Sequence, residues 1–386
     1  MWAGLLWSRA LLSVATILFL TTAILTGGRQ AWQLFRSSYW LQGMTLLFWM
    51  PFLSGLWSAD RHQWGMLMQE KIPLLLFPFA AFVLSELDIS VRRSLKIALC
   101  SMLILSILYS MGMYYANPGM EEAYLRAKVL RVVMSDDHVR YAWLLLLSLI
   151  WVAAEWEGRW MEWGYSLLTI FFLHLLASKT GLLGFYLLLF CWIFFRMRGW
   201  KRWLMVSGVA LLPLLAWFAL PSFQNRLRFV WWDFQQYSRG GYVEGLSDTP
   251  RVFSFRGGLD LFRRHWQSGM GMGDVKQGML EWYGKQAPFL KPYEQLMPSN
   301  EFLFMGVSAG ILSVFVMLTF MVYPFFMRTL RGFRWIAFHA LMFMISLYEI
   351  GLQTQYGVFL YGFFGVFFFT MAVSDHRSSR SSTARC

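Results

Sequence analysis

Charged residues are scarce in this sequence, because Asp, Glu, Lys and Arg make up only 14% of its 386 residues, against about 25% in a soluble domain. Cysteine is scarce as well. The three that occur, Cys100, Cys191 and Cys386, show no spacing typical of a disulfide framework or a metal site. Hydrophobic residues reach 58%. This composition excludes a soluble enzyme and predicts an all-α protein that crosses a membrane many times.

Several familiar chemical motifs are missing too. The sequence has neither a Walker A loop nor an HExxH motif, and no dense group of Asp, His and Cys indicates a metal. The glycine-rich stretch GMGMGD (269–274) follows no strand, so we interpret it as a turn after a helix. The net charge of +13 is spread between apolar runs, which argues against nucleic acid. We therefore expect no metal, no cofactor and no nucleic-acid partner.

The apolar residues fall into about eleven stretches (10–12), each close to the length that spans a bilayer as a helix. The first stretch lacks a small-residue cleavage site and others follow it, so we expect a retained helix rather than a signal peptide. The stretches cover residues 9–26, 39–57, 72–86, 94–115, 139–155, 162–177, 180–196, 203–220, 300–326, 334–352 and 354–373.

Lys and Arg predict the orientation, because cytoplasmic loops are enriched in both. If the C-terminal tail is cytoplasmic, the loops on its side and the tail hold 16 Lys and Arg, against 8 in the short segments opposite. The long connection then lies in the periplasm, with helical patterns near 251–266 and 275–284. The predicted parts are an N-terminal bundle (1–220), a periplasmic loop (221–299), C-terminal helices (300–373) and a basic cytoplasmic tail (374–386).

Ionisable residues in membrane helices are expensive and therefore mark candidate sites. In this topology several of them gather at the periplasmic ends of helices. Arginine has a planar fork that matches phosphate oxygens, so the pattern favours an anionic group, such as a lipid-linked pyrophosphate, at the outer leaflet. Carboxylates there could pair with the cations or act as a base. The candidates are His138, Arg140, Lys179, Arg251, Arg256, Asn300, Glu301 and Glu349.

Each candidate also has a purely structural interpretation. Arg140 and Lys179 could extend to the membrane interface without binding anything. Glu349 could pair with either of them only to hold the fold together. His138 could be a loop histidine beside two aspartates.

Five segments occur in an order that resembles the O-antigen ligase and O-antigen polymerase family of integral membrane glycosyltransferases, of the type found in Bacteroidetes. They surround the one long loop and together span about residues 45–370. The segments are SGLWSADRHQWGMLMQEKIPLLLFPFAAF (54–82), ASKTGLLGF (177–185), RVFSFRGGLDLF with SGMGMGD (251–262 and 268–274), PSNEFLFMGVSAGIL (298–312) and YEIGLQTQYGVFLYGFF (348–364).

The resemblance implies an enzyme of the bacterial inner membrane whose active face is periplasmic. Its donor is a glycan on undecaprenyl pyrophosphate, and an acceptor hydroxyl attacks the anomeric carbon with inversion and without a metal. Lipid A–core is the favoured acceptor, as in a ligase. A repeat unit, as in a polymerase, and a protein hydroxyl are alternatives.

The resemblance also assigns residues. Arg251 matches the family's loop arginine, and Lys179 stands where the family has a second arginine. Ser299 stands where the family has a histidine, followed by Asn300, and a serine hydroxyl is a poor base without a partner. The base role could pass to Glu301 or to a residue elsewhere, or catalysis could rely on positioning and charge alone. Residues that could act as base or support it are His138, His265, Glu349 and Asp274.

Two other classes of function remain open at the level of sequence. A transporter or flippase of lipid-linked sugars would need broken helices, internal repeats and polar groups at the membrane midplane, and the sequence shows none of these clearly. A non-catalytic assembly partner is the second, because the family's histidine and one arginine are replaced.

Overall fold

The computed structural model describes residues 1–116, 130–238, 244 and 248–383, and within these ranges the chain is helical, without a strand. The N-terminal part begins with a short buried helix that precedes the first long one. Ser8, Ser38 and Asp60 accept hydrogen bonds from the backbone at the starts of the next three long helices, as N-cap residues do. The helices are α1 (Trp2–Trp7), α2 (Arg9–Ser37), α3 (Tyr39–Ser54), α4 (Arg61–Leu76), η1 (Phe77–Ala80), α5 (Ala81–Ser85) and α6 (Ile89–Tyr115).

The middle of the chain forms four helices joined by short connections, followed by the long segment. The described residues between 221 and 299 form three α-helices and one 3-10 turn. The sequence pattern had not indicated the first of these helices. The four helices are α8 (His138–Ala154), α9 (Trp160–Leu176), α10 (Lys179–Arg196) and α11 (Trp200–Ala219). The long segment contains α12 (Pro221–Ser238), α13 (Thr249–Arg264), α14 (Val275–Gln286) and η2 (Pro292–Glu294).

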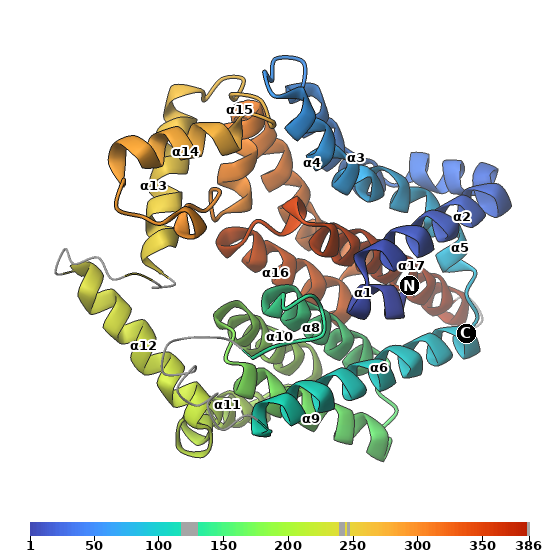
Figure 1. Cartoon of the computed structure of the whole chain (residues 1–386). Coiled ribbons are helices and arrows are strands. Elements are labelled where there is room, and N and C mark those ends of the chain that lie inside the picture. The colour runs from blue at the N-terminus through green and yellow to red at the C-terminus, as the bar shows by residue number, and fades with distance from the viewer. Residues whose placement is uncertain (117–129, 239–243, 245–247, 384–386) are drawn as a thin grey trace.

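The C-terminal part supplies the centre of the molecule. Helix α17 lies in the middle of the bundle (Figure 1), and 89% of its most apolar stretch is buried. It packs against α4, α5, α8 and α16 through a run of phenylalanines that are almost fully buried. The elements are α15 (Glu301–Val322), η3 (Tyr323–Phe326), η4 (Arg328–Leu330), α16 (Phe333–Tyr348), η5 (Gly351–Gln353) and α17 (Gln355–Thr383).

Each of the eleven predicted stretches falls on a helix, but their number as membrane spans stays a prediction. Seven helices of the described chain are long and apolar enough to cross a membrane, and α8 and α16 are shorter apolar helices. Helices α3 and α9 have only 16 and 17 residues. The expected tail begins as a continuation of α17, which runs to Thr383 although its apolar stretch ends at Ser374. Residues 384–386 of that tail lie outside the described residues.

The glycine-rich stretch is a docking element rather than a loose turn. Helix α15 breaks at Ala309 and Gly310, where Gly310 has a φ of 78°. The freed carbonyls of Val307 and Ser308 accept hydrogen bonds from Met270 (2.8 Å) and Gly271 (3.1 Å). A broken helix among apolar neighbours is tolerated when its backbone groups find such partners. The break therefore anchors the end of α13 against α15.

Candidate active site

The site is built where the long segment meets the end of α16. Arg251, in the first turn of α13, donates from Nη2 to Oε1 of Glu349 at 2.7 Å. The Glu349 side chain is 10% exposed and the Arg251 side chain 37%. The two residues are 98 positions apart in the sequence, so the fold brings together a cation and a carboxylate that the sequence places at one face of the bundle.

A second ion pair lies next to the first. Nζ of Lys179, at the start of α10, is 2.5 Å from Oδ2 of Asp248, the residue before α13. Asp233 of α12 is almost fully buried. It accepts hydrogen bonds from the Asp248 backbone N–H (2.9 Å) and from Thr249 Oγ1 (3.1 Å). Asp233 therefore fixes the start of α13, and with it the position of both ion pairs.

Arg226 of α12 is a member of this cluster that the sequence analysis missed. It lies within electrostatic range of Asp248, Arg251 and Asp233, and Lys179 in turn is influenced by Arg226 and Arg251. Burial lowers the pKa of Arg226 below its ordinary value, and the charge of Asp248 opposes that shift. An arginine remains charged under these conditions. Three cations thus share one small region, which we call the cationic cluster: Lys179, Arg226 and Arg251.

Two further predicted residues border this cluster. His138, at the start of α8, lies within electrostatic range of Arg226 and Arg251. Arg140, two positions beyond it in α8's first turn, donates from Nη2 to the Ile350 carbonyl at 3.2 Å, and its Nη1 lies 3.6 Å from Oδ1 of Asp137. Arg140 is therefore attached to the same connection between α16 and α17 that carries Glu349.

Ser299 and Asn300 lie on the other side of α13. The hydroxyls of Ser299 and Ser254 are 2.6 Å apart, and Ser254 also donates to the carbonyl of Arg251 at 2.8 Å. Asn300 caps α15, because its Oδ1 accepts from the Leu303 N–H (2.9 Å), and its Nδ2 donates to the Leu347 carbonyl (3.0 Å). Ser299 is therefore one helical turn from Arg251, and Asn300 has a structural role.

Glu301 is completely buried and faces Lys71, which the sequence analysis did not single out. Both bind the backbone of the same residue, Leu352, in the α16–α17 connection. The Leu352 N–H donates to Glu301 Oε2 at 3.0 Å, and Lys71 Nζ donates to the Leu352 carbonyl at 2.6 Å. The amide of Gln353 also donates to Glu301. These bonds fix the connection that presents Glu349 to Arg251.

Three predicted residues have other surroundings. The guanidinium of Arg256 lies over the ring of Phe253 at 5.8 Å. His265 ends α13, 14 residues and therefore about 21 Å from Arg251 along the helix. Asp274 accepts hydrogen bonds from the backbone N–H groups of Ala59 and Asp60, both at 2.8 Å. Asp274 thus ties the glycine-rich stretch to the loop between α3 and α4.

The cluster combines two properties. Its cations are held by carboxylates, and an anionic group can replace those carboxylates as their partner. A largely apolar cavity of about 430 Å³ opens between α12 and α13 and has Asp248, the partner of Lys179, in its wall. Among the described residues no three His, Cys, Asp or Glu side chains gather as metal ligands. An anion with an attached hydrocarbon chain would match this combination.

Fold and site together define a multi-pass membrane protein with a cluster of cationic side chains at one end of its helical bundle. The family model described as O-antigen ligase matches residues 164–318. That stretch runs from α9 to α15 and contains the cationic cluster, Asp248 and Ser299. Over these residues the chain is similar to the O-antigen ligase family, which confirms the resemblance seen in the sequence. None of the curated proteins compared with this chain matches its sequence.

Proposed function

We propose that this protein transfers a glycan from a polyprenyl pyrophosphate, undecaprenyl pyrophosphate in the bacterial inner membrane, to an acceptor hydroxyl at the periplasmic face. The observation that supports this most directly is the cationic cluster beside an apolar cavity. The acceptor is the lipid A–core, with a growing repeat unit or a protein hydroxyl as alternatives of the same chemistry. Localisation and orientation rest on the distribution of Lys and Arg in the sequence.

The reaction is a single displacement. The acceptor oxygen forms a bond to the anomeric carbon while the bond from that carbon to the pyrophosphate oxygen breaks, with inversion. The pyrophosphate leaves with the bonding electron pair, so negative charge develops on its oxygens. Arg251, Arg226 and Lys179 are positioned to stabilise that charge, and fixed cations of this kind contribute strongly to catalysis in a region that excludes water. The step needs no metal in this scheme.

The acceptor proton must also go to a group near the cluster. Ser299 cannot take it, because its hydroxyl is hydrogen bonded to Ser254 rather than to a base. His138 lies within electrostatic range of Arg251 and Arg226, whereas His265 is at the far end of α13. We assign the role of general base to His138, with Glu349 holding Arg251 in place.

The experiment that tests this proposal replaces Arg251. We expect Arg251→Ala to lower glycan transfer by about 100-fold or more, because one stabilising group of the leaving pyrophosphate is lost. Arg251→Lys, which keeps the charge without the planar fork, should retain an intermediate activity. Transfer is measured in membranes that contain equal amounts of each variant.

Arg263→Ala is the matched control, because Arg263 is an exposed arginine near the opposite end of the same helix. It should transfer glycan like the unaltered protein. Full activity of Arg251→Ala would remove Arg251 from the site and contradict the proposal.

A further inference from the structure

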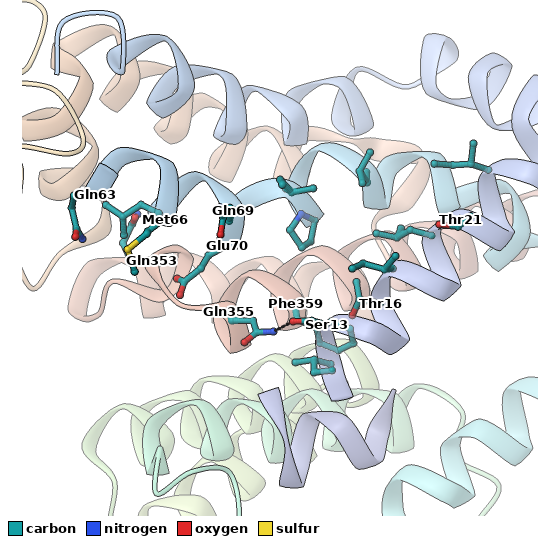
Figure 2. Close-up of a pocket in the computed structure, with 18 residues that line it drawn as sticks. Ser13, Thr16, Thr21, Gln63, Met66, Gln69, Glu70, Gln353, Gln355 and Phe359 are labelled. Atoms are coloured by element: carbon teal, nitrogen blue, oxygen red, sulfur yellow. Dashed lines mark hydrogen bonds between the residues drawn. The ribbon is translucent and has the colours of Figure 1, made fainter. Parts of the chain in front are cut away.

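A second cavity, of about 610 Å³, lies between α2, α4 and the start of α17, away from the cationic cluster (Figure 2). We call it the α2–α4 groove. One end is polar, and the remainder is lined mainly by aliphatic side chains. Its apolar wall is formed by Leu12, Ile17, Leu20, Ile24, Leu67, Ile72, Pro73, Leu76 and Phe359. Helices α2 and α4 with its continuation are both long enough to cross a membrane, so a hydrocarbon chain can run along the groove.

The polar end consists mostly of uncharged groups. Figure 2 shows Gln63, Gln69, Glu70 and Gln353 there, with Gln355 bonded to Ser13 nearby. The residues that line the groove, all within the described chain, include no Lys, Arg or His. The one carboxylate, Glu70, is within electrostatic range of Arg9 and Lys71. A phosphate group has no cationic partner on this lining, in contrast to the cluster at Arg251.

One atom in this region requires a hydrogen-bond donor. The Gln353 side chain is 9% exposed and lines the groove. Its Nε2 donates a hydrogen bond to the Glu301 carboxylate. Its Oε1 is buried without a hydrogen-bond partner in the described structure. A buried acceptor without a donor is costly, so a ligand hydroxyl or amide N–H at this point would be favourable.

The groove and the cationic cluster share one structural segment. The connection between α16 and α17 presents Glu349 to Arg251 on one side. On the other side it presents Gln353 and Gln355 to the groove. The buried pair of Glu301 and Lys71 holds this connection from within. A lipid in the groove would therefore place its polar end next to the segment that also forms the donor site.

We propose that the α2–α4 groove holds an acyl chain of the acceptor lipid, a chain whose first polar group is an amide or hydroxyl rather than a phosphate. This inference rests on the proposed function in one respect, because it calls the lipid the acceptor of the transfer reaction. The expected chemistry of the ligand does not depend on that reaction. The apolar wall contacts the acyl chain, and Gln353 Oε1 accepts a hydrogen bond from the amide or hydroxyl of the lipid. The two substrates then approach the α16–α17 connection from opposite sides.

The test uses the full-length protein in vesicles with two photoreactive lipids, a long-chain N-acylglucosamine and a phosphatidylglycerol. The variant Ile17→Trp fills the groove, and Leu18→Trp is the matched control. Both residues are 63% exposed on α2, but only Ile17 lines the groove. We expect the N-acylglucosamine to label peptides of α2 and α4, Ile17→Trp to reduce this labelling severalfold, and Leu18→Trp to leave it unchanged. Stronger labelling of the same peptides by phosphatidylglycerol, or equal labelling in the two variants, would overturn the proposal.

Transfer assays on the same variants separate this inference from the proposed function. Ile17→Trp should raise the KM for the acceptor lipid and leave the KM for the donor unchanged. Arg251→Ala should label like the unaltered protein while losing transfer. If the labelling is as expected but neither the unaltered protein nor any variant transfers glycan, the proposed function is wrong. The lipid site in the groove is then still supported. If transfer is normal in Ile17→Trp, the groove does not serve the acceptor.

Discussion

At the scale of single residues, the most informative feature is the environment of the histidines. Of the histidines whose surroundings are described, His174 bonds Tyr186 within the bundle and His339 is fully buried among aromatic rings. His138 is the one within electrostatic range of the cationic cluster. Position 299 has no histidine, but α8 places the imidazole of His138 within electrostatic range of the cationic cluster.

This arrangement predicts a difference between two histidine variants. His138→Ala should lower glycan transfer by roughly 100-fold or more, in the range typical for loss of a general base. His265→Ala, far along α13, should transfer like the unaltered protein. The measurement is the initial rate of transfer at saturating donor. Loss of activity in His265→Ala with retention in His138→Ala would contradict our assignment of the base.

A second residue-scale prediction concerns stability rather than chemistry. Glu301→Gln removes the buried carboxylate that lies within electrostatic range of the buried Lys71 ammonium, so the lysine loses a compensating charge. We expect a clearly lower melting temperature of the purified protein in detergent. The double variant Lys71→Met, Glu301→Gln removes both charges and should regain most of the loss. A double variant no more stable than Glu301→Gln would mean that the two side chains do not act as a pair.

Many site residues were visible in the sequence, because a charged group at the end of an apolar stretch stands out. Lys179 and Glu349 were found in this way, whereas Arg251 was found in the long loop, where it matches the family's loop arginine. Lys71 could have been found by the same reasoning, since it precedes the apolar run of α4, but its partner Glu301 is 230 positions away. Arg226 carried no such signal, because it lies in a polar, aromatic stretch of the long segment where charge is common.

At the scale of elements, the contact between the glycine-rich stretch and the break in α15 is what fixes the end of α13. Gly269 has a φ of 73°, and a Cβ at that position would collide with the backbone of Ser308. Gly271 has a φ of 96° and lies against Ser58. Both positions therefore require glycine for two reasons, a left-handed backbone and a close approach of another segment.

The contact between the glycine-rich stretch and α15 predicts different effects on stability for two glycine substitutions. Gly269→Ala should destabilise the protein by about 1–3 kcal/mol, because alanine is strained in the left-handed backbone conformation. The steric collision of its Cβ with the backbone of Ser308 adds to this loss. Gly284→Ala in α14 meets no atom within 4 Å and should be neutral or stabilise by up to about 1 kcal/mol. Thermal unfolding of both purified variants decides this. Equal melting temperatures would mean that the docked turn is not rigid.

The positions of the helices and most of their starts followed well from hydrophobic runs, but the start of α4 did not. Helix α4 begins at Arg61, eleven residues before the predicted start at residue 72, because its first turns carry charged and amide side chains that lower the local hydropathy. Those turns carry Gln63, Gln69 and Glu70, the polar end of the α2–α4 groove. Helix α12 was missed for a similar reason. The groove could therefore not be predicted from the sequence.

At the scale of the whole molecule, the predicted alternation of loops agrees with which segments meet. Contacts at the site join the loop before α4, the start of α10, the long segment and the α16–α17 connection. Residues from the opposite loops pair with one another instead, as Arg93 and Glu157 do. The bundle thus has two distinct ends, and the described residues of the long segment contact the end with the cationic cluster.

The central claim is that this protein joins a lipid-linked glycan to an acceptor, and deletion of its gene in the host tests it most directly. The envelope glycans are separated on a gel and detected with an antibody to the polymer, with the unaltered gene and Arg251→Ala each returned to the deletion strain. Our account predicts loss of polymer from lipid A–core while polymer accumulates on the lipid carrier, restored only by the unaltered gene. A ladder reduced to a single repeat unit would identify a polymerase instead. An unchanged glycan pattern in the deletion strain would contradict the account.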